Sequence, residues 1–133
     1  MVKLALVMHA PLGSAFADCA AHILGHQPDL LVFDVEADAS PEQAALELER
    51  LLMPYRQDGA LILCDIYGAT PFNIASNCVR NLALQKMDAA LVTGANLCMV
   101  IKALTDNQDN PEQLSEKVRQ GALKGVVRAD CFS

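Results

Sequence analysis

The sequence predicts an α/β fold: a doubly wound, mostly parallel sheet of four strands with helices on both faces. Short apolar runs of strand length alternate with longer segments that begin with helix-start signals, as in folds built from strand–helix units. One run, residues 60–64 (ALILC), is apolar at every position, which is typical of a strand covered on both faces. With 133 residues, 53% of them hydrophobic, the chain is expected to form one domain over residues 1–133.

The expected strands are short runs rich in aliphatic residues and bounded by Gly, Pro or polar residues. In chain order they cover residues 2–8, 30–35, 60–64 and 87–92. A last apolar run, residues 126–131, has strand length but no helix after it. We therefore expect this run to pair at an edge of the sheet or to be exchanged with another subunit.

The expected helices begin after residues that can cap a helix N-terminus, and three of them have proline at or near the first position. They cover residues 15–24, 41–53, 71–84, 97–104 and 111–121. The predicted N-caps are Ser14, Ser40, Thr70 and Asn110. Gly25 is expected to end the first helix, because glycine readily adopts the left-handed conformation found at helix ends.

The charge balance excludes some classes of partner. Sixteen acidic and ten basic residues give a net charge of −6, which argues against a nucleic-acid binder and against binding to an anionic membrane surface. No apolar stretch approaches the ~20 residues of a membrane span, and the first apolar run is too short for a signal peptide. The five cysteines have neither disulfide nor zinc spacing. We therefore expect a cytoplasmic protein without a metal, a cofactor or direct insertion into a membrane.

Two residues with complementary chemistry are expected at one edge of the sheet. Ligands of open parallel sheets bind beyond the carboxyl ends of the strands. His9 ends the first strand and Asp65 follows the third, and these two strands are usually neighbours in a doubly wound sheet. A carboxylate that accepts one imidazole N–H fixes the tautomer and leaves the other ring nitrogen as a nucleophile. The other loops at this edge contribute Asp38, Thr93 and Asn96.

An anion-binding site is expected beside this pair. The helix that begins at Pro71 directs its free N–H groups into the same crevice, Gly68 permits close backbone approach, and the Thr70 hydroxyl can donate a hydrogen bond. A nucleophilic imidazole beside an anion site indicates phosphoryl transfer onto histidine. The sequence has no P-loop and no metal-binding acidic cluster, so another molecule would have to supply the activated phosphate.

Each of these signals also has a purely structural interpretation. A lone histidine after a strand is commonly a loop residue, Asp65 can simply cap its own loop, and Thr70 followed by proline is a common helix start. Cys64, next to Asp65, occupies an apolar strand position and is better explained as a buried, inert thiol than as a nucleophile. The three signals together, around one crevice, favour a functional site more strongly than any one of them alone.

Three stretches together resemble a known family over roughly residues 2–127. They are CDIYGATPFNIAS at 64–76, the first strand ending in His9 with its small-residue loop, and TGANLCM at 93–99. In this order and spacing they resemble the IIA component of the mannose class (mannose/fructose/sorbose) of the phosphoenolpyruvate-dependent sugar phosphotransferase system. The sequence departs from that family at Ala10 and Ala69, where glycine is common, which leaves the phosphate contacts open.

The resemblance implies a function and partners. It implies a homodimer in which a late strand can be exchanged, with His9 phosphorylated through Nε2 and Asp65 holding Nδ1–H. Thr70, Gly68 and Phe72 would lie at the phosphate with the amides of the helix start. The phosphoryl donor would be the histidine phosphocarrier protein HPr, and the acceptor would be a separate IIB component.

Two other interpretations compete with the phosphocarrier. A response-regulator-like receiver is phosphorylated on an aspartate, and Asp65 ends the third strand as that site would. A receiver also needs acidic metal ligands after its first strand and a lysine after its last, and neither is present at these positions here. A non-catalytic or regulatory partner-binding module of the same fold stays open, and the test that separates it is whether His9 accepts phosphate.

Overall fold

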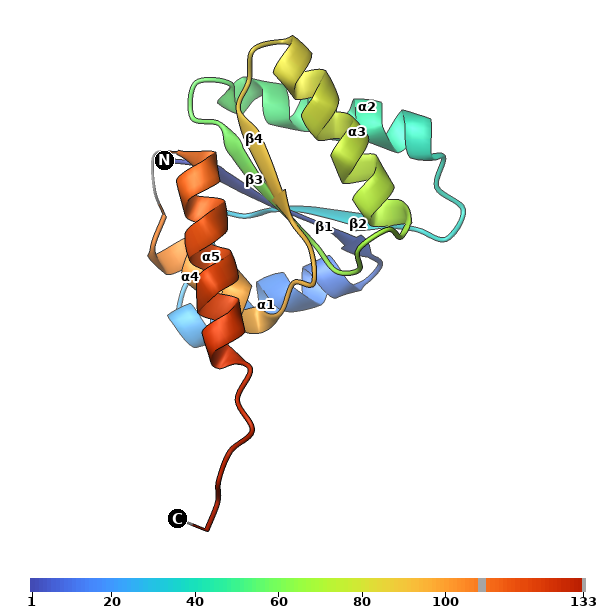
Figure 1. Cartoon of the computed structure of the whole chain (residues 1–133). Helices are drawn as coiled ribbons and strands as arrows, with labels where there is room; N and C mark the ends of the chain where they lie inside the picture. Colours follow the sequence, from blue (N-terminus) through green and yellow to red (C-terminus); the bar gives the residue numbers. More distant parts are fainter. Residues whose placement is uncertain (108–109, 133) are drawn as a thin grey trace.

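A parallel four-stranded sheet forms the centre of the structure (Figure 1). The computed structural model describes residues 1–107 and 110–132. The strand order is β2-β1-β3-β4, and the strands are β1 (Lys3–His9), β2 (Leu31–Val35), β3 (Ala60–Cys64) and β4 (Ala89–Val92). The predicted fold class and the predicted neighbourhood of the first and third strands are therefore confirmed.

Five helices cover the two faces of this sheet. They are α1 (Leu12–Leu24), α2 (Pro41–Leu52), α3 (Thr70–Leu84), α4 (Leu97–Thr105) and α5 (Pro111–Gly125), and a 3-10 turn, Met53–Tyr55, follows α2. Helices α2 and α3 pack on one face, and α1, α4 and α5 pack on the other (Figure 1). The strand-to-helix loops therefore emerge together at the carboxyl ends of the strands.

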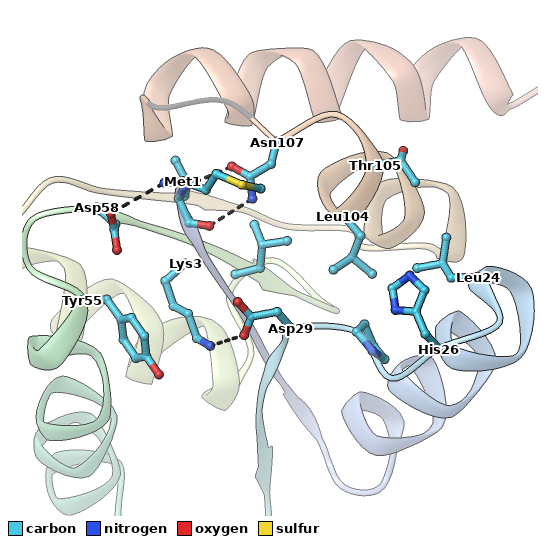
Figure 2. A pocket seen from close by; sticks show the side chains of 13 residues that line it. Met1, Lys3, Leu24, His26, Asp29, Tyr55, Asp58, Leu104, Thr105 and Asn107 are labelled. Carbon is cyan, nitrogen blue, oxygen red and sulfur yellow. Dashed lines mark hydrogen bonds and ion pairs between the residues drawn. The ribbon is translucent and has the colours of Figure 1, made fainter.

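A pocket of about 680 Å³ lies at the opposite end of the sheet, where the strands begin (Figure 2). Several of its polar side chains contact one another or the adjacent backbone. The Lys3 ammonium lies 2.7 Å from Asp29 Oδ1 and 4.5 Å from the centre of the Tyr55 ring, and Asn107 exchanges hydrogen bonds with the backbone of Val2. These contacts join the start of β1 to the segments around it.

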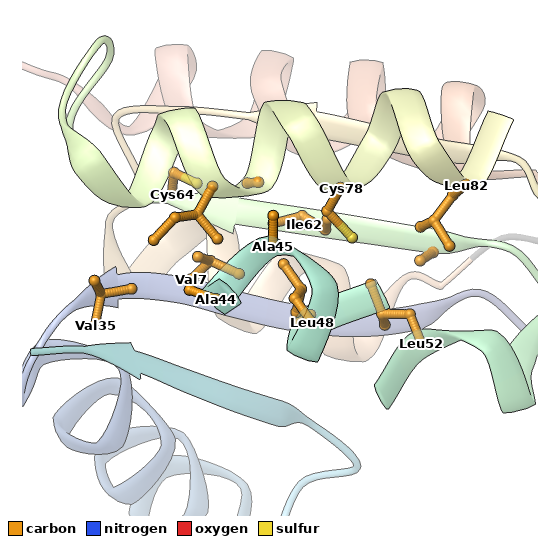
Figure 3. Close-up of a cluster of buried hydrophobic side chains, with 14 of the residues drawn as sticks. Val7, Val35, Ala44, Ala45, Leu48, Leu52, Ile62, Cys64, Cys78 and Leu82 are labelled. Atoms are coloured by element: carbon orange, nitrogen blue, oxygen red, sulfur yellow. The ribbon is translucent and has the colours of Figure 1, made fainter. Parts of the chain in front are cut away.

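Two apolar layers, one on each face, hold the helices to the sheet. Figure 3 shows the layer beneath α2 and α3, in which Leu48 and Leu82 contact a cluster that includes Ile62 from β3. Leu61 and Leu63, which point to the opposite face, belong to the second layer with Leu114 and other residues of α4 and α5. All five residues of β3 are buried because both of its faces are covered, as its uninterrupted apolar run predicts.

Two of the predicted N-caps are confirmed and two are wrong. Ser40 Oγ accepts the Gln43 N–H, and Asn110 Oδ1 accepts the Glu112 N–H. Ser14 is not a cap, because α1 begins earlier, at Leu12, and the Ser14 hydroxyl donates to Asp34 instead. Thr70 is already the first residue of α3, and the cap position is occupied by the residue before it.

The predicted terminal strand, residues 126–131, does not form within the single chain. Helix α5 continues to Gly125, past the predicted end at residue 121, because Val118 and Ala122 are buried against the sheet and α4. This packing outweighs the cost of about 1 kcal/mol that glycine imposes within a helix. Residues 126–130 form no strand and leave the body of the structure (Figure 1).

Candidate functional site

His9 and Asp65 lie together at the carboxyl ends of the two central strands. His9 is the last residue of β1, and Asp65 directly follows β3. The register pairs Val7 with Cys64, so the two strands end almost level with each other. Parallel pairing alone therefore brings together two residues that are 56 positions apart in the sequence.

The Asp65 carboxylate holds both the ring and the backbone of His9. Its Oδ2 lies 2.7 Å from His9 Nδ1 and accepts the His9 backbone N–H at 2.9 Å, while its Oδ1 accepts the Ile66 N–H at 2.9 Å. An ionised carboxylate only accepts hydrogen bonds, so Nδ1 carries the proton and Nε2 of the neutral ring keeps its lone pair. The Asp65 side chain is 7% exposed, whereas that of His9 is 48% exposed. The orienting group is thus buried and the ring it orients is accessible.

These hydrogen bonds determine the ionisation of Asp65. Burial alone would raise the pKa of the carboxyl, because a charged group loses solvation. The backbone and ring hydrogen bonds from His9, with the Ile66 N–H, outweigh that effect and hold the pKa of Asp65 below its ordinary value. The carboxylate is therefore ionised at neutral pH and can stabilise positive charge on the His9 ring.

The loop after β3 leads directly into a helix start with unused donors. Gly68 has φ +83°, a left-handed conformation that favours glycine, and the rings of Tyr67 and Phe72 lie 4.9 Å apart across the loop. Within the described part of the chain, the backbone N–H groups of Thr70 and Phe72 have no acceptor, and the side chain of Thr70 is exposed. Gly68, Thr70 and Phe72 thus lie on the segment that continues directly from Asp65.

The other candidates at this edge have structural explanations or no contact. Asn96 caps α4 by accepting the Met99 N–H at 2.9 Å, and the loop that includes Thr93 is tied to β3 through the Ala95 N–H and the Cys64 carbonyl. Among the described residues, none makes a hydrogen bond to the exposed Asp38 side chain.

The thiol beside the site is unreactive, as the sequence predicts. Burial, with a further contribution from the Asp65 charge, raises the pKa of Cys64 to about 12. A thiol with this pKa stays protonated at neutral pH and is a poor nucleophile.

Sequence reasoning missed Asp34, the fourth residue of β2. Its carboxylate accepts the backbone N–H groups of Gly13 and Ser14 at 2.8 and 3.2 Å and the Ser14 hydroxyl at 2.5 Å. The available signal was a single acidic residue inside the otherwise apolar run LVFDV. Asp34 therefore belongs to the same edge of the sheet as His9, on the neighbouring strand.

No helix within residues 1–107 and 110–132 combines the length and the apolar character needed to cross a membrane.

Comparison with known proteins gives a family match over most of the chain. The family described as PTS system fructose IIA component (EIIA-man) matches residues 3–120. No curated protein sequence matches significantly.

Solved structures share the fold at low sequence identity. A mannose/sorbose-specific IIA subunit of the phosphotransferase system from Enterococcus faecalis has a TM-score of 0.85 and 23% identity, over 99% of this chain and 97% of that chain. The phosphotransferase system component EIIA from Streptococcus agalactiae has a TM-score of 0.81 and 23% identity, over 96% and 97%. A sigma-54 interaction domain protein from Enterococcus faecalis has a TM-score of 0.76 and 15% identity, over 99% and 97%.

The lowered pKa of Asp65 predicts how stability depends on pH. Its ionised form stabilises the fold above the unfolded pKa of about 4, and this contribution is lost as the pH falls through the lower folded value. We expect Asp65→Asn to reduce the free energy of unfolding, measured with urea, by a constant amount between pH 7 and about pH 5 and by less below about pH 4.

The matched control is Asp38→Asn, which removes an exposed carboxylate from the same edge of the sheet. It should cost less stability than Asp65→Asn at neutral pH, because no described residue makes a hydrogen bond to it. A deficit of Asp65→Asn that stays the same from pH 7 to pH 3 would contradict the assignment of a lowered pKa.

Proposed function

The chain belongs to the family of PTS fructose IIA components, and from this premise we propose that it carries phosphoryl groups on His9. Phospho-HPr would be the donor, and a separate IIB component would be the acceptor. The observation that supports this proposal most directly is the 2.7 Å contact between His9 Nδ1 and Asp65 Oδ2, because it leaves Nε2 as an accessible nucleophile.

The proposed transfer moves a phosphoryl group between two histidine nitrogens. The lone pair on His9 Nε2 attacks phosphorus, the phosphorus–nitrogen bond of the donor breaks, and the bonding pair returns to the donor imidazole. Positive charge develops on the His9 ring, where the ionised Asp65 stabilises it through Nδ1–H. In the second transfer a nucleophilic group of the IIB component attacks the phosphorus, the bond from phosphorus to His9 Nε2 breaks, and its electron pair returns to the His9 ring.

The start of α3 is proposed to bind the transferred phosphoryl group. The N–H groups of Thr70 and Phe72 and the Thr70 hydroxyl are available donors, and the positive end of this 15-residue helix faces the same edge of the sheet. Gly68 supplies the left-handed backbone of this loop, and the space beside it is open, since no protein atom lies within 4 Å of the position that a Cβ would occupy. Such donors stabilise the charge of a phosphoryl group in transfer.

The geometry at Asp65 argues against phosphorylation of that carboxylate, as in a receiver. Both of its oxygens already accept N–H groups, and its side chain is 7% exposed. A nucleophilic aspartate has to present an accessible oxygen to its donor, whereas the Asp65 carboxylate is largely buried and already holds three N–H groups.

We further propose a cytoplasmic homodimer in which the C-terminal segment contacts a second copy. β4 is an edge strand, and a pocket of about 600 Å³ lies between β4 and α5, lined by Leu91 and Leu123 among others. In the single chain Val127 is 72% exposed and Phe132 fully exposed. Pairing this segment with β4 of a partner would cover both the open edge and these apolar side chains.

The first test is phosphorylation of the protein by phosphoenolpyruvate, the first enzyme of the system and HPr. Intact mass should show one acid-labile phosphoryl group on the wild type and none on His9→Ala. This variant should still fold, with a loss of stability of about 1.5–3 kcal/mol from the missing ring hydrogen bond to the ionised Asp65. Asp65→Asn should slow transfer by about tenfold or more, because it disturbs the tautomer and leaves the charge on the ring unpaired.

His22→Ala and His26→Ala are the controls, since they remove the other two histidines. Both should be phosphorylated like the wild type. A folded wild type that takes up no phosphate beside a working IIA control would support a non-catalytic partner-binding module instead.

The proposed phosphate site is tested with Thr70→Val, which keeps the shape of the side chain and removes the hydroxyl donor. Losing a hydrogen bond to a charged group costs about 1.5–3 kcal/mol, so the rate of transfer from phospho-HPr should fall by roughly tenfold or more. Thr93→Val, in the neighbouring loop, should transfer at the wild-type rate. Equal rates for Thr70→Val and the wild type would remove Thr70 from the site.

The proposed dimer is tested by sedimentation of Val127→Asp and Leu84→Asp, two substitutions at exposed apolar positions. Val127→Asp should shift the protein toward the mass of one chain, because a charge would be buried against the partner. Leu84→Asp, on α3, should keep the mass of the wild-type dimer. If the wild type sediments as one chain, the proposed dimer is wrong.

A further inference from the structure

Asp34 joins the first turn of α1 to β2. Its Oδ1 accepts the Gly13 N–H at 2.8 Å, and its Oδ2 accepts both the Ser14 N–H at 3.2 Å and the Ser14 hydroxyl at 2.5 Å. These partners lie 20 and 21 positions away in the sequence. A side chain of β2 therefore provides the acceptors that a helix usually obtains from its own N-cap.

Helix α1 has no N-cap side chain of its own. Pro11 occupies the cap position and makes no side-chain hydrogen bond to the helix. Gly13 lets the helix approach the strand closely, since a Cβ at this position would lie 2.6 Å from Asp34 Oδ1. The start of α1 is thus positioned by a contact across the fold and not by its local sequence.

This start is only a short distance from His9 along the chain. Ala10 and Pro11 alone separate His9 from Leu12, the first residue of α1. Ala10 N–H donates to the carbonyl of Val35, the residue directly after Asp34, at 3.0 Å. The segment between His9 and α1 is therefore held to β2 as well. A shift of the first turn of α1 would therefore be transmitted to His9, whose ring makes its contact with Asp65 from the end of β1.

We propose that Asp34 is a positioning residue for His9: by holding the first turn of α1 against β2, it keeps the imidazole in contact with Asp65. Asp34 touches no reacting atom, so its effect acts through the backbone of residues 9–12. The consequence for phosphoryl transfer rests on the proposed function, whereas the effect on the ring does not. Asp34 also occupies the amides of Gly13 and Ser14, which leaves the start of α3 as the donor group for a phosphoryl ligand at this edge.

The test compares Asp34→Ala with Asn110→Ala in the full chain. Asn110 is an equivalent control because it accepts two N–H groups at the start of α5, from Glu112 and Gln113. Asn110→Ala therefore also removes a helix cap, but at a helix start that is distant from His9. Nitrogen-15 NMR of the imidazole gives the fraction of His9 rings with the proton on Nδ1. Transfer from phospho-HPr gives the rate.

Both variants are expected to lower the midpoint of thermal unfolding. Only Asp34→Ala is expected to lower the Nδ1–H fraction of His9 and to slow transfer by roughly tenfold or more, because small misplacements of a reacting group are costly. Asp34→Asn, which keeps an oxygen for Gly13, should restore part of both readouts. If Asp34→Ala does not fold, Asp34→Asn and Ser14→Ala replace it. Both should lower the Nδ1–H fraction of His9 and the transfer rate, by less than is expected for Asp34→Ala.

An Asp34→Ala protein whose His9 spectrum and transfer rate match those of Asn110→Ala would overturn the proposal. If the wild type accepts no phosphate, the proposed function fails, and the NMR comparison still decides whether Asp34 positions the ring.

Discussion

The contact between the Asp65 carboxylate and the His9 imidazole depends on the parallel register of β1 and β3. Asp65 uses one oxygen for both the ring and the backbone of His9 and the other for Ile66, so the ends of the two central strands are joined at a single side chain. That arrangement fixes the tautomer without burying the ring. The rest of the sheet supports it, because β3 is buried along its whole length and cannot shift without disturbing both apolar layers.

Two adjacent residues at the end of β3 show how local contacts decide ionisation. Cys64 is buried without a charge-stabilising partner, and the pKa of its thiol rises to about 12. Asp65 is also shielded from solvent, but three N–H groups stabilise its charge and hold its pKa below the ordinary value. The chain therefore keeps an inert thiol and an ionised carboxylate side by side, and only the carboxylate contributes to the chemistry proposed for His9.

The sequence was sufficient to predict features whose determining contacts are local or follow from strand order. The caps at Ser40 and Asn110 bond within three residues, and the meeting of His9 with Asp65 follows from the usual neighbourhood of the first and third strands. It failed where tertiary contacts override local signals. Ser14 looks like a cap, yet its hydroxyl donates to Asp34, 20 positions away. The segment 126–131 has strand composition but forms no strand in the single chain.

The two helix starts nearest His9 differ in how their backbone N–H donors are used. One start serves to position the loop after His9, and the other has donors available for a ligand. At α1 the carboxylate of Asp34 satisfies the amides of Gly13 and Ser14, so this start is closed to another anion and serves to place the loop after His9. At α3 no side chain caps the helix, and the Thr70 and Phe72 amides have no acceptor in the described chain. An internal anion thus holds the scaffold at one helix, and the donors of the other are available to an external anion, as the phosphoryl transfer proposed for His9 would use them.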